Sequence, residues 1–74
     1  MRPTKLKIGN KLLIRPALGT RSRIGFFVRR ETACGGRKVV NYVRFPDYAG
    51  LNGPGDDGTR EMSDYDLSRR GEYA

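Results

Sequence analysis

The sequence is short of the residues on which most enzyme and metal sites are built. Its 74 residues include one cysteine, Cys34, and no histidine or tryptophan. A single thiol excludes an intramolecular disulfide, and without histidine neither the common Cys–His zinc sites nor the Ser–His and Cys–His nucleophile–base pairs can be assembled. We therefore expect no metal ion and no cofactor, and the chain is predicted not to be an enzyme.

Long apolar runs are also missing. No stretch approaches the ~18 residues of a transmembrane helix, and no apolar signal-peptide region is present. We expect a cytoplasmic protein that does not associate with a membrane. A domain of this length buries only about 60% of the surface that its unfolded chain exposes, so its core should be small and its stability marginal.

Acidic residues are nearly absent from the first part of the chain. Residues 1–44 contain twelve Lys or Arg and one acid, Glu31, whereas residues 45–74 contain seven acids and three arginines. Either the basic part binds a polyanion, or the acidic part folds against it and neutralises it within the molecule. Both interpretations stay open, because the two parts of so small a domain share one surface. Eleven of the fifteen basic residues are Arg, which favours bidentate recognition of anions.

The strongest strand pattern covers residues 38–45, which are rich in β-branched and aromatic residues and contain neither Gly nor Pro. Glycines 35 and 36 precede this run and Pro46 follows it, so turn-forming residues bound it at both ends. Side chains alternate along a strand. One face is predicted to carry Val39, Asn41, Val43 and Phe45, and the other Lys38, Val40, Tyr42 and Arg44.

Three further strands are predicted over residues 11–15, 24–30 and 59–62, with a candidate edge strand near Leu6 and Ile8. In the second of these, alternation predicts Ile24, Phe26 and Val28 inward and Phe27 and Arg29 outward. Ser63 followed by Asp66 resembles a capping box, which predicts one helical or 3-10 turn over residues 63–67. The predicted core is Leu12, Ile14, Ile24, Phe26, Val28, Val43, Phe45 and Leu67.

These elements predict an all-β fold organised as one domain. A basic N-terminal arm at residues 1–8 precedes a small five-stranded barrel over residues 9–67, and a charged C-terminal tail occupies residues 68–74. The order of a short strand, a long loop, two hairpin strands, a second loop, a short strand and a terminal turn at Asp66-Leu67 resembles the Src-homology-3-like barrel of Tudor and KOW modules. The segment Arg23-Ile24-Gly25-Phe26-Phe27-Val28 is similar, more distantly, to the aromatic strand of cold-shock domains, which are oligonucleotide-binding barrels.

Basic residues interleaved with aromatic residues carry the functional prediction. Cations neutralise phosphates and aromatic rings stack on bases, and the resembled barrels bind nucleic acids, peptides or larger machines through one sheet face and its loops. We predict a small nucleic-acid-binding module for DNA or RNA. The candidate nucleic-acid-binding residues are Arg15, Arg21, Arg23, Phe27, Arg29, Arg30, Arg37, Lys38, Tyr42 and Arg44.

The alternative is a protein-interaction module, for example a phage or mobile-element inhibitor or accessory subunit of a larger nucleic-acid enzyme. Aromatic and aliphatic side chains on the loops and tail would then enter pockets of the partner. The candidate anchors are Tyr48, Leu51, Tyr65 and Tyr73. The sequence leaves the oligomeric state open.

Overall fold

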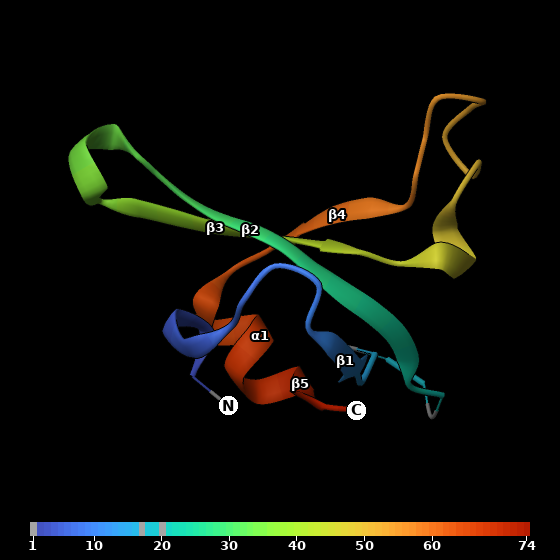
Figure 1. Cartoon of the computed structure of the whole chain (residues 1–74), viewed down its shortest axis with the longest axis horizontal. Helices are drawn as coiled ribbons and strands as arrows, with labels where there is room; N and C mark the ends of the chain where they lie inside the picture. Colours follow the sequence, from blue (N-terminus) through green and yellow to red (C-terminus); the bar gives the residue numbers. More distant parts are fainter. Residues whose placement is uncertain (1, 17, 20) are drawn as a thin grey trace.

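The computed structural model describes residues 2–16, 18–19 and 21–74, and one antiparallel sheet organises it (Figure 1). Met1 of the predicted arm and Ala17 and Thr20 of the predicted loop lie outside the described residues. The strands are β1 (Lys11–Ile14), β2 (Arg23–Ala33), β3 (Lys38–Arg44), β4 (Thr59–Met62) and β5 (Gly71–Tyr73). Their order is β4-β3-β2-β1-β5. A β-rich fold with five strands is confirmed, but the sheet is not closed.

The helical elements are short. One α-helix, α1 (Asp64–Arg70), joins β4 to β5, and the 3-10 helices are η1 (Pro3–Lys5), η2 (Cys34–Gly36) and η3 (Pro46–Tyr48). The Ser63 hydroxyl oxygen accepts a hydrogen bond from the Asp66 amide at 3.1 Å, so the predicted cap is confirmed. The helix runs one turn further than predicted and buries Leu67 in the core.

The two ends of the chain correct the sequence prediction. Residues 68–74, predicted as a charged tail, complete α1 and form β5, which pairs with β1 from Leu12↔Tyr73 to Ile14↔Gly71. This pairing satisfies backbone groups that β1 would otherwise expose as an edge strand. No strand forms at Leu6 and Ile8: η1 leads to a partly buried Leu6 that packs on the core, while Ile8 is exposed.

The inward face of β2 is the opposite of the predicted one. Phe27 is buried at 4% exposure, whereas Ile24, Phe26 and Val28 are only half-buried. Gly25 shares the inward face with Phe27, and a Cβ on Gly25 would lie 2.7 Å from Val43 Cγ1 and 3.2 Å from Phe45 Cε1. The core is therefore already filled at that point, and the residue facing it must lack a side chain. The strand register also shifts between Phe27 and Arg29, so Arg29 still faces outward as predicted.

The core lies on the inward face of the sheet. It comprises Leu12, Ile14, Phe27, Val43, Phe45, Met62 and Leu67. Asn41 is the buried polar residue among them, and its Nδ2 donates to the Met62 carbonyl oxygen at 3.2 Å and to Asp64 Oδ1 at 2.7 Å. Asn41 thereby fixes the end of β4 and the start of α1 against β3. The predicted inward face of β3 is confirmed.

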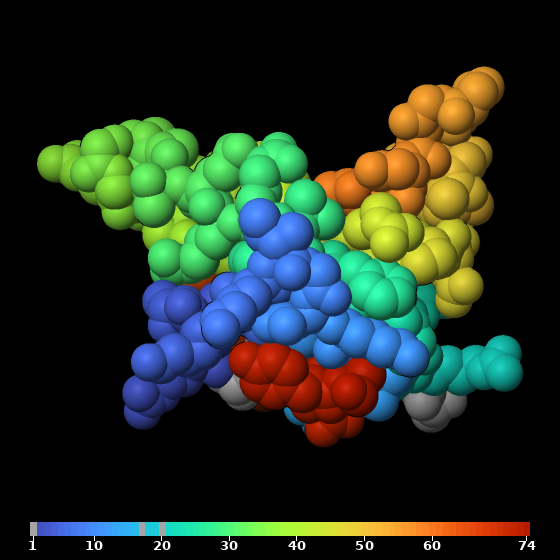
Figure 2. All heavy atoms as spheres, viewed as in Figure 1, coloured from blue at the N-terminus to red at the C-terminus, as the bar shows by residue number. Residues whose placement is uncertain are grey.

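Two segments project from the body of the domain. The outer halves of β2 and β3 form a hairpin that extends to one side, and the loop between β3 and β4 extends to the opposite side (Figure 1). Figure 2 shows both as separate protrusions, with the N-terminal residues packed across the molecule between them. Residues 29–38 of the hairpin are exposed. Side chains on both faces of the outer hairpin are therefore open to solvent.

Two carboxylates anchor these segments and should make stability depend on pH. Arg60 Nη2 lies 2.9 Å from Asp56 Oδ2, and this hydrogen bond, with those from the backbone amides of Gly58 and Asn52, lowers the pKa of Asp56 below its usual range. Hydrogen bonds from Arg30 and Asn41 lower the pKa of Asp64. A carboxyl group whose pKa is lower in the folded than in the unfolded state stabilises the fold at pH values above its unfolded-state pKa of about 4. This stabilisation is lost as the pH falls through the folded-state pKa.

We expect the thermal midpoint to fall as the pH is lowered from about 5 to about 2. Asp56→Asn should lower the midpoint at neutral pH and give a shallower acid limb than the wild type. Glu72→Gln, which removes an exposed carboxylate, is the control and should keep the wild-type acid limb. An unchanged acid limb in Asp56→Asn would contradict the stabilising role of the Asp56–Arg60 pair.

Candidate nucleic-acid interface

The side of the sheet opposite the core carries a cluster of cationic and aromatic side chains, with Glu61 opposite Tyr42 and Glu31 beside Arg29 at its margin. We define the outer face as Lys11, Phe26, Arg29, Tyr42 and Arg44. Register places Lys11 opposite Phe26 and Phe26 opposite Arg44, so these three form one row across β1, β2 and β3. Arg29 lies opposite Tyr42 in the neighbouring row. The outer face is therefore contributed by three hydrogen-bonded strands, and the sheet backbone fixes its spacing.

Each aromatic ring of the outer face is paired with a guanidinium group. The Arg29 Cζ lies 4.1 Å from the Tyr42 ring centroid, and the Arg44 Cζ lies 5.0 Å from the Phe26 ring centroid. In such cation–π pairs the negative face of the ring attracts the guanidinium group that lies over it. Arg29 Nε also donates to Glu31 at 2.6 Å. The Tyr42 and Phe26 rings therefore each position a guanidinium group on the outer face.

Burial and nearby acids act on the ionisation of this surface. Desolvation, reinforced by the charges of Glu31 and Glu61, raises the pKa of Tyr42, so its hydroxyl stays protonated at neutral pH. The hydrogen bond to Glu31 raises the pKa of Arg29. Both groups therefore act as hydrogen-bond donors across the physiological range.

The predicted candidate residues do not all share one surface. Tyr42, Arg29 and Arg44 lie together on the outer face, as predicted. Phe27 does not, because it lies in the core, and it cannot stack on a base. Arg37 and Lys38 lie at the exposed tip of the β2–β3 hairpin, and Arg21 is exposed in the loop before β2.

The remaining three arginines point elsewhere. Arg30 shares the face of Asn41 and pairs with Asp64 of α1 at 2.7 Å. Arg23 pairs with Asp47 at 3.2 Å and lies 5.2 Å from the Tyr48 ring centroid. Arg15 follows β1, and its Nη2 donates to the Arg69 carbonyl oxygen at the end of α1. These three arginines hold loops and the helix in place.

Intramolecular neutralisation accounts for only part of the charge asymmetry. Among the described residues, four ion pairs form: Arg23–Asp47, Arg29–Glu31, Arg30–Asp64 and Arg60–Asp56. Three of them join the basic first part of the chain to an acid, and two of those acids belong to the acidic second part. The other eleven basic residues have no ion-pair partner within residues 2–16, 18–19 and 21–74, so most of the positive charge faces solvent.

Two outer-face residues, Phe26 and Lys11, were missed by sequence reasoning. Gly25 is the signal that identifies Phe26, because a glycine inside a strand indicates close approach of another element to that face. Lys11 precedes the buried Leu12, so it must point outward once β1 is placed in the sheet. Its position beside Phe26 depends on the β1–β2 register, which the sequence does not specify.

Comparisons with known protein families, with curated proteins and with solved structures found no match. Within the described part of the chain, no group of three or more Asp, Glu or Cys residues is placed to hold a metal ion. Every helix in that part is too short or too polar to cross a membrane.

Proposed function

We propose that the chain is a small nucleic-acid-binding module that binds a DNA or RNA strand on its outer face, not an enzyme. The observation that carries this proposal is the pair of adjacent guanidinium–aromatic contacts, Arg29 on Tyr42 and Arg44 on Phe26, with Lys11 beside them. Cations on a sheet surface neutralise backbone phosphates. A guanidinium held over a ring offers its free side to an unpaired base, which can stack on it.

The projecting hairpin extends the same cationic surface. Arg37 and Lys38 at its exposed tip have no ion-pair partner among the described residues. Between the Tyr42 row and this tip the sheet carries Glu31 opposite Val40, and Glu31 already accepts a hydrogen bond from Arg29. A strand that runs from the Phe26 row toward the tip therefore meets cations at the two ends of this path. We further propose that the five strands curl into the Src-homology-3-like barrel that the order of the elements resembles, with α1 joining the last two strands.

Binding should depend steeply on salt. For single strands, the logarithm of the affinity falls with the logarithm of the salt concentration by about 0.7 per neutralised phosphate. Lys11→Ala with Arg44→Ala should weaken binding across sequences and flatten the slope by about 1.4. Fluorescence anisotropy on a labelled single strand at several salt concentrations measures both effects.

Tyr42→Ala separates stacking from charge, because it leaves every cation in place. Base–aromatic stacking contributes about 1–3 kcal/mol per base, so this variant should bind single strands more weakly and duplex nearly as the wild type does. Lys5→Ala with Lys7→Ala removes the same charge from the N-terminal arm and is the matched control. If this control flattens the slope as much as the outer-face pair, the strand does not bind the outer face.

A protein-interaction module is the second candidate, favoured by the exposure of Leu51, Tyr65 and Tyr73 at 68%, 65% and 56%. The fourth proposed anchor, Tyr48, instead packs on Phe45 with ring centroids 5.0 Å apart. Leu51 lies in the projecting β3–β4 loop, whereas Tyr65 and Tyr73 lie in α1 and β5 (Figure 1). Fractionation of cell extract with and without nuclease distinguishes the two functions, since only a nucleic-acid complex is lost on digestion.

A further inference from the structure

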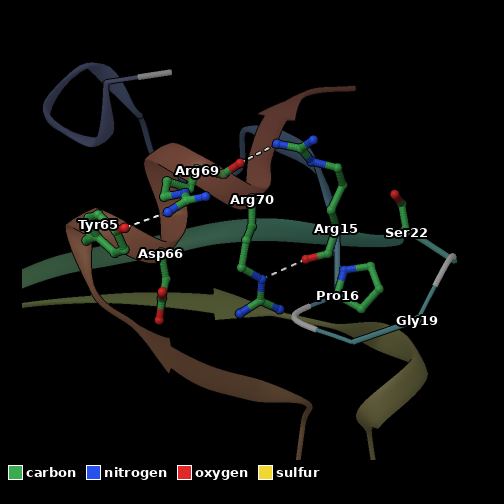
Figure 3. Close-up of a pocket in the computed structure, with 8 residues that line it drawn as sticks. All are labelled: Arg15, Pro16, Gly19, Ser22, Tyr65, Asp66, Arg69 and Arg70. Carbon is green, nitrogen blue, oxygen red and sulfur yellow. Dashed lines mark hydrogen bonds between the residues drawn. The ribbon is translucent and has the colours of Figure 1, made fainter.

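A pocket of about 470 Å³ lies between α1 and the end of β1 (Figure 3). Three arginines line it, Arg15, Arg69 and Arg70, together with Ser22, Tyr65 and Asp66. In Figure 3 the Arg70 guanidinium lies between Asp66 on the helix side and Pro16 on the strand side, and the Arg69 guanidinium lies beside Tyr65. None of the residues that line this pocket belongs to the outer face, so the pocket is a separate feature.

The three guanidinium groups are held by neutral oxygens. Arg15 donates to the Arg69 carbonyl oxygen, Arg69 Nη1 donates to the Tyr65 hydroxyl at 2.6 Å, and Arg70 Nε donates to the Arg15 carbonyl oxygen at 2.7 Å. Each guanidinium has five N–H donors and makes one side-chain hydrogen bond to the described residues. Within those residues no carboxylate lies at ion-pairing distance from any of the three. Each of the three guanidinium groups therefore keeps an unneutralised positive charge and unused N–H donors that a ligand could bind.

In a neighbouring pocket of about 290 Å³, by contrast, the arginine charges are partly neutralised by carboxylates. It is also lined by arginines, among them Arg23 and Arg60, but Asp47 and Asp56 neutralise these two. The larger pocket has three arginines against the single carboxylate of Asp66, which gives its lining a net charge of +2. An anion of charge near −2 would neutralise it.

We propose that this pocket binds a phosphate group in its dianionic form, as in inorganic phosphate or a phosphate monoester. Such a group carries about −1.5 to −2 charges at neutral pH and three acceptor oxygens, which planar guanidinium groups bind in bidentate pairs. The volume is within the ~300–1,000 Å³ of small-ligand sites, so the group can carry a substituent. Either a free phosphorylated ligand or the terminal phosphate of a nucleic-acid strand supplies this chemistry.

The direct test is a titration of the full chain with inorganic phosphate at constant ionic strength, followed by backbone amide shifts. We expect saturable shifts at Ser22, Tyr65 and Arg69 that chloride and acetate do not produce. Arg69→Gln should weaken phosphate binding about ten-fold or more, because it removes a charged hydrogen-bond donor. Arg37→Gln, which removes the same charge from the exposed hairpin tip, should change it less than about two-fold.

Asp66→Asn provides a test that loss of structure cannot imitate. Removing the carboxylate from the lining should tighten phosphate binding by about two- to five-fold. A melting curve for each variant confirms that it folds, and if Arg69→Gln does not fold, the wild-type titration and Asp66→Asn decide. Equal weakening by Arg37→Gln and Arg69→Gln, no gain in Asp66→Asn, or phosphate shifts no larger than those with chloride would each overturn the proposal.

Two oligonucleotides of one sequence, with a 5′-phosphate or a 5′-hydroxyl, identify the source of the phosphate. A tighter complex with the phosphorylated strand, lost in Arg69→Gln, supports a strand end as the ligand. Equal binding of the two strands, with inorganic phosphate still saturating the pocket, supports a free phosphorylated ligand. The inorganic-phosphate arm contains no nucleic acid, so its result does not depend on whether the outer face binds a strand.

Discussion

Replacing Phe27 by Ala should unfold the domain at room temperature. Phe27 is 4% exposed in a core of seven buried apolar side chains, and loss of a buried phenylalanine costs about 3–5 kcal/mol. A single core in a chain of this size rarely supplies more than about 3–5 kcal/mol of net stability. The loss therefore matches all the stability that the fold can be expected to have.

Phe26→Ala is the matched control, because it removes the same side chain one position away. Phe26 lies on the outer face under Arg44, so its loss should lower stability by about 1 kcal/mol and leave a cooperative transition. Urea denaturation followed by circular dichroism measures both variants. If Phe26→Ala unfolds the domain and Phe27→Ala does not, the inward face of β2 is the one that the sequence pattern predicted.

Gly58→Ala should have the second-largest effect. Gly58 has φ +91°, and a Cβ at this position would overlap the carbonyl oxygen of Phe45. The Gly58 carbonyl oxygen also accepts a hydrogen bond from the Phe45 amide at 2.9 Å. The left-handed conformation costs an alanine about 1–2 kcal/mol, and a lost backbone hydrogen bond adds about 1 kcal/mol. We expect a loss of about 2–4 kcal/mol, since the backbone must move to relieve the overlap.

Gly55→Ala controls for glycine replacement in the same loop. A Cβ on Gly55 meets no atom within 4 Å, and its φ is not in the left-handed region. The thermal midpoint of Gly55→Ala should stay within a few degrees of the wild-type midpoint, whereas that of Gly58→Ala should fall steeply. Similar midpoints for the two variants would show that the close contact between the β3–β4 loop and Phe45 is absent.

The sequence predicted the elements whose signals are local. The alternation over residues 38–45 gave the buried face of β3 correctly, and Ser63 with Asp66 predicted the start of α1. In β2, both faces are apolar enough to be buried, with Ile24, Phe26 and Val28 on one and Phe27 on the other. The choice depends on Val43 of β3 and on Phe45, which follows β3, because these two side chains occupy the space in front of Gly25.

The candidate site was predictable to the same extent. Tyr42 and Arg44 were placed on the outer face correctly because they follow from alternation within β3. Arg29 faces outward because the register shifts between Phe27 and Arg29, since alternation alone would put it on the buried face with Phe27. Phe26 and Lys11 depend on the inward face of β2 and on the β1–β2 register. Gly71–Tyr73 was mistaken for tail because a three-residue strand has too few positions to show a pattern.

Amide chemical-shift mapping with a short single-stranded oligonucleotide tests most directly whether the outer face binds nucleic acid. At about 50 mM salt, where phosphate contacts are strong, saturable shifts should concentrate on Phe26, Arg29, Tyr42 and Arg44. They should diminish as salt is raised and weaken markedly in Tyr42→Ala. No shifts with RNA, single-stranded DNA or duplex DNA, or shifts confined to Leu51, Tyr65 and Tyr73, would contradict the proposed function.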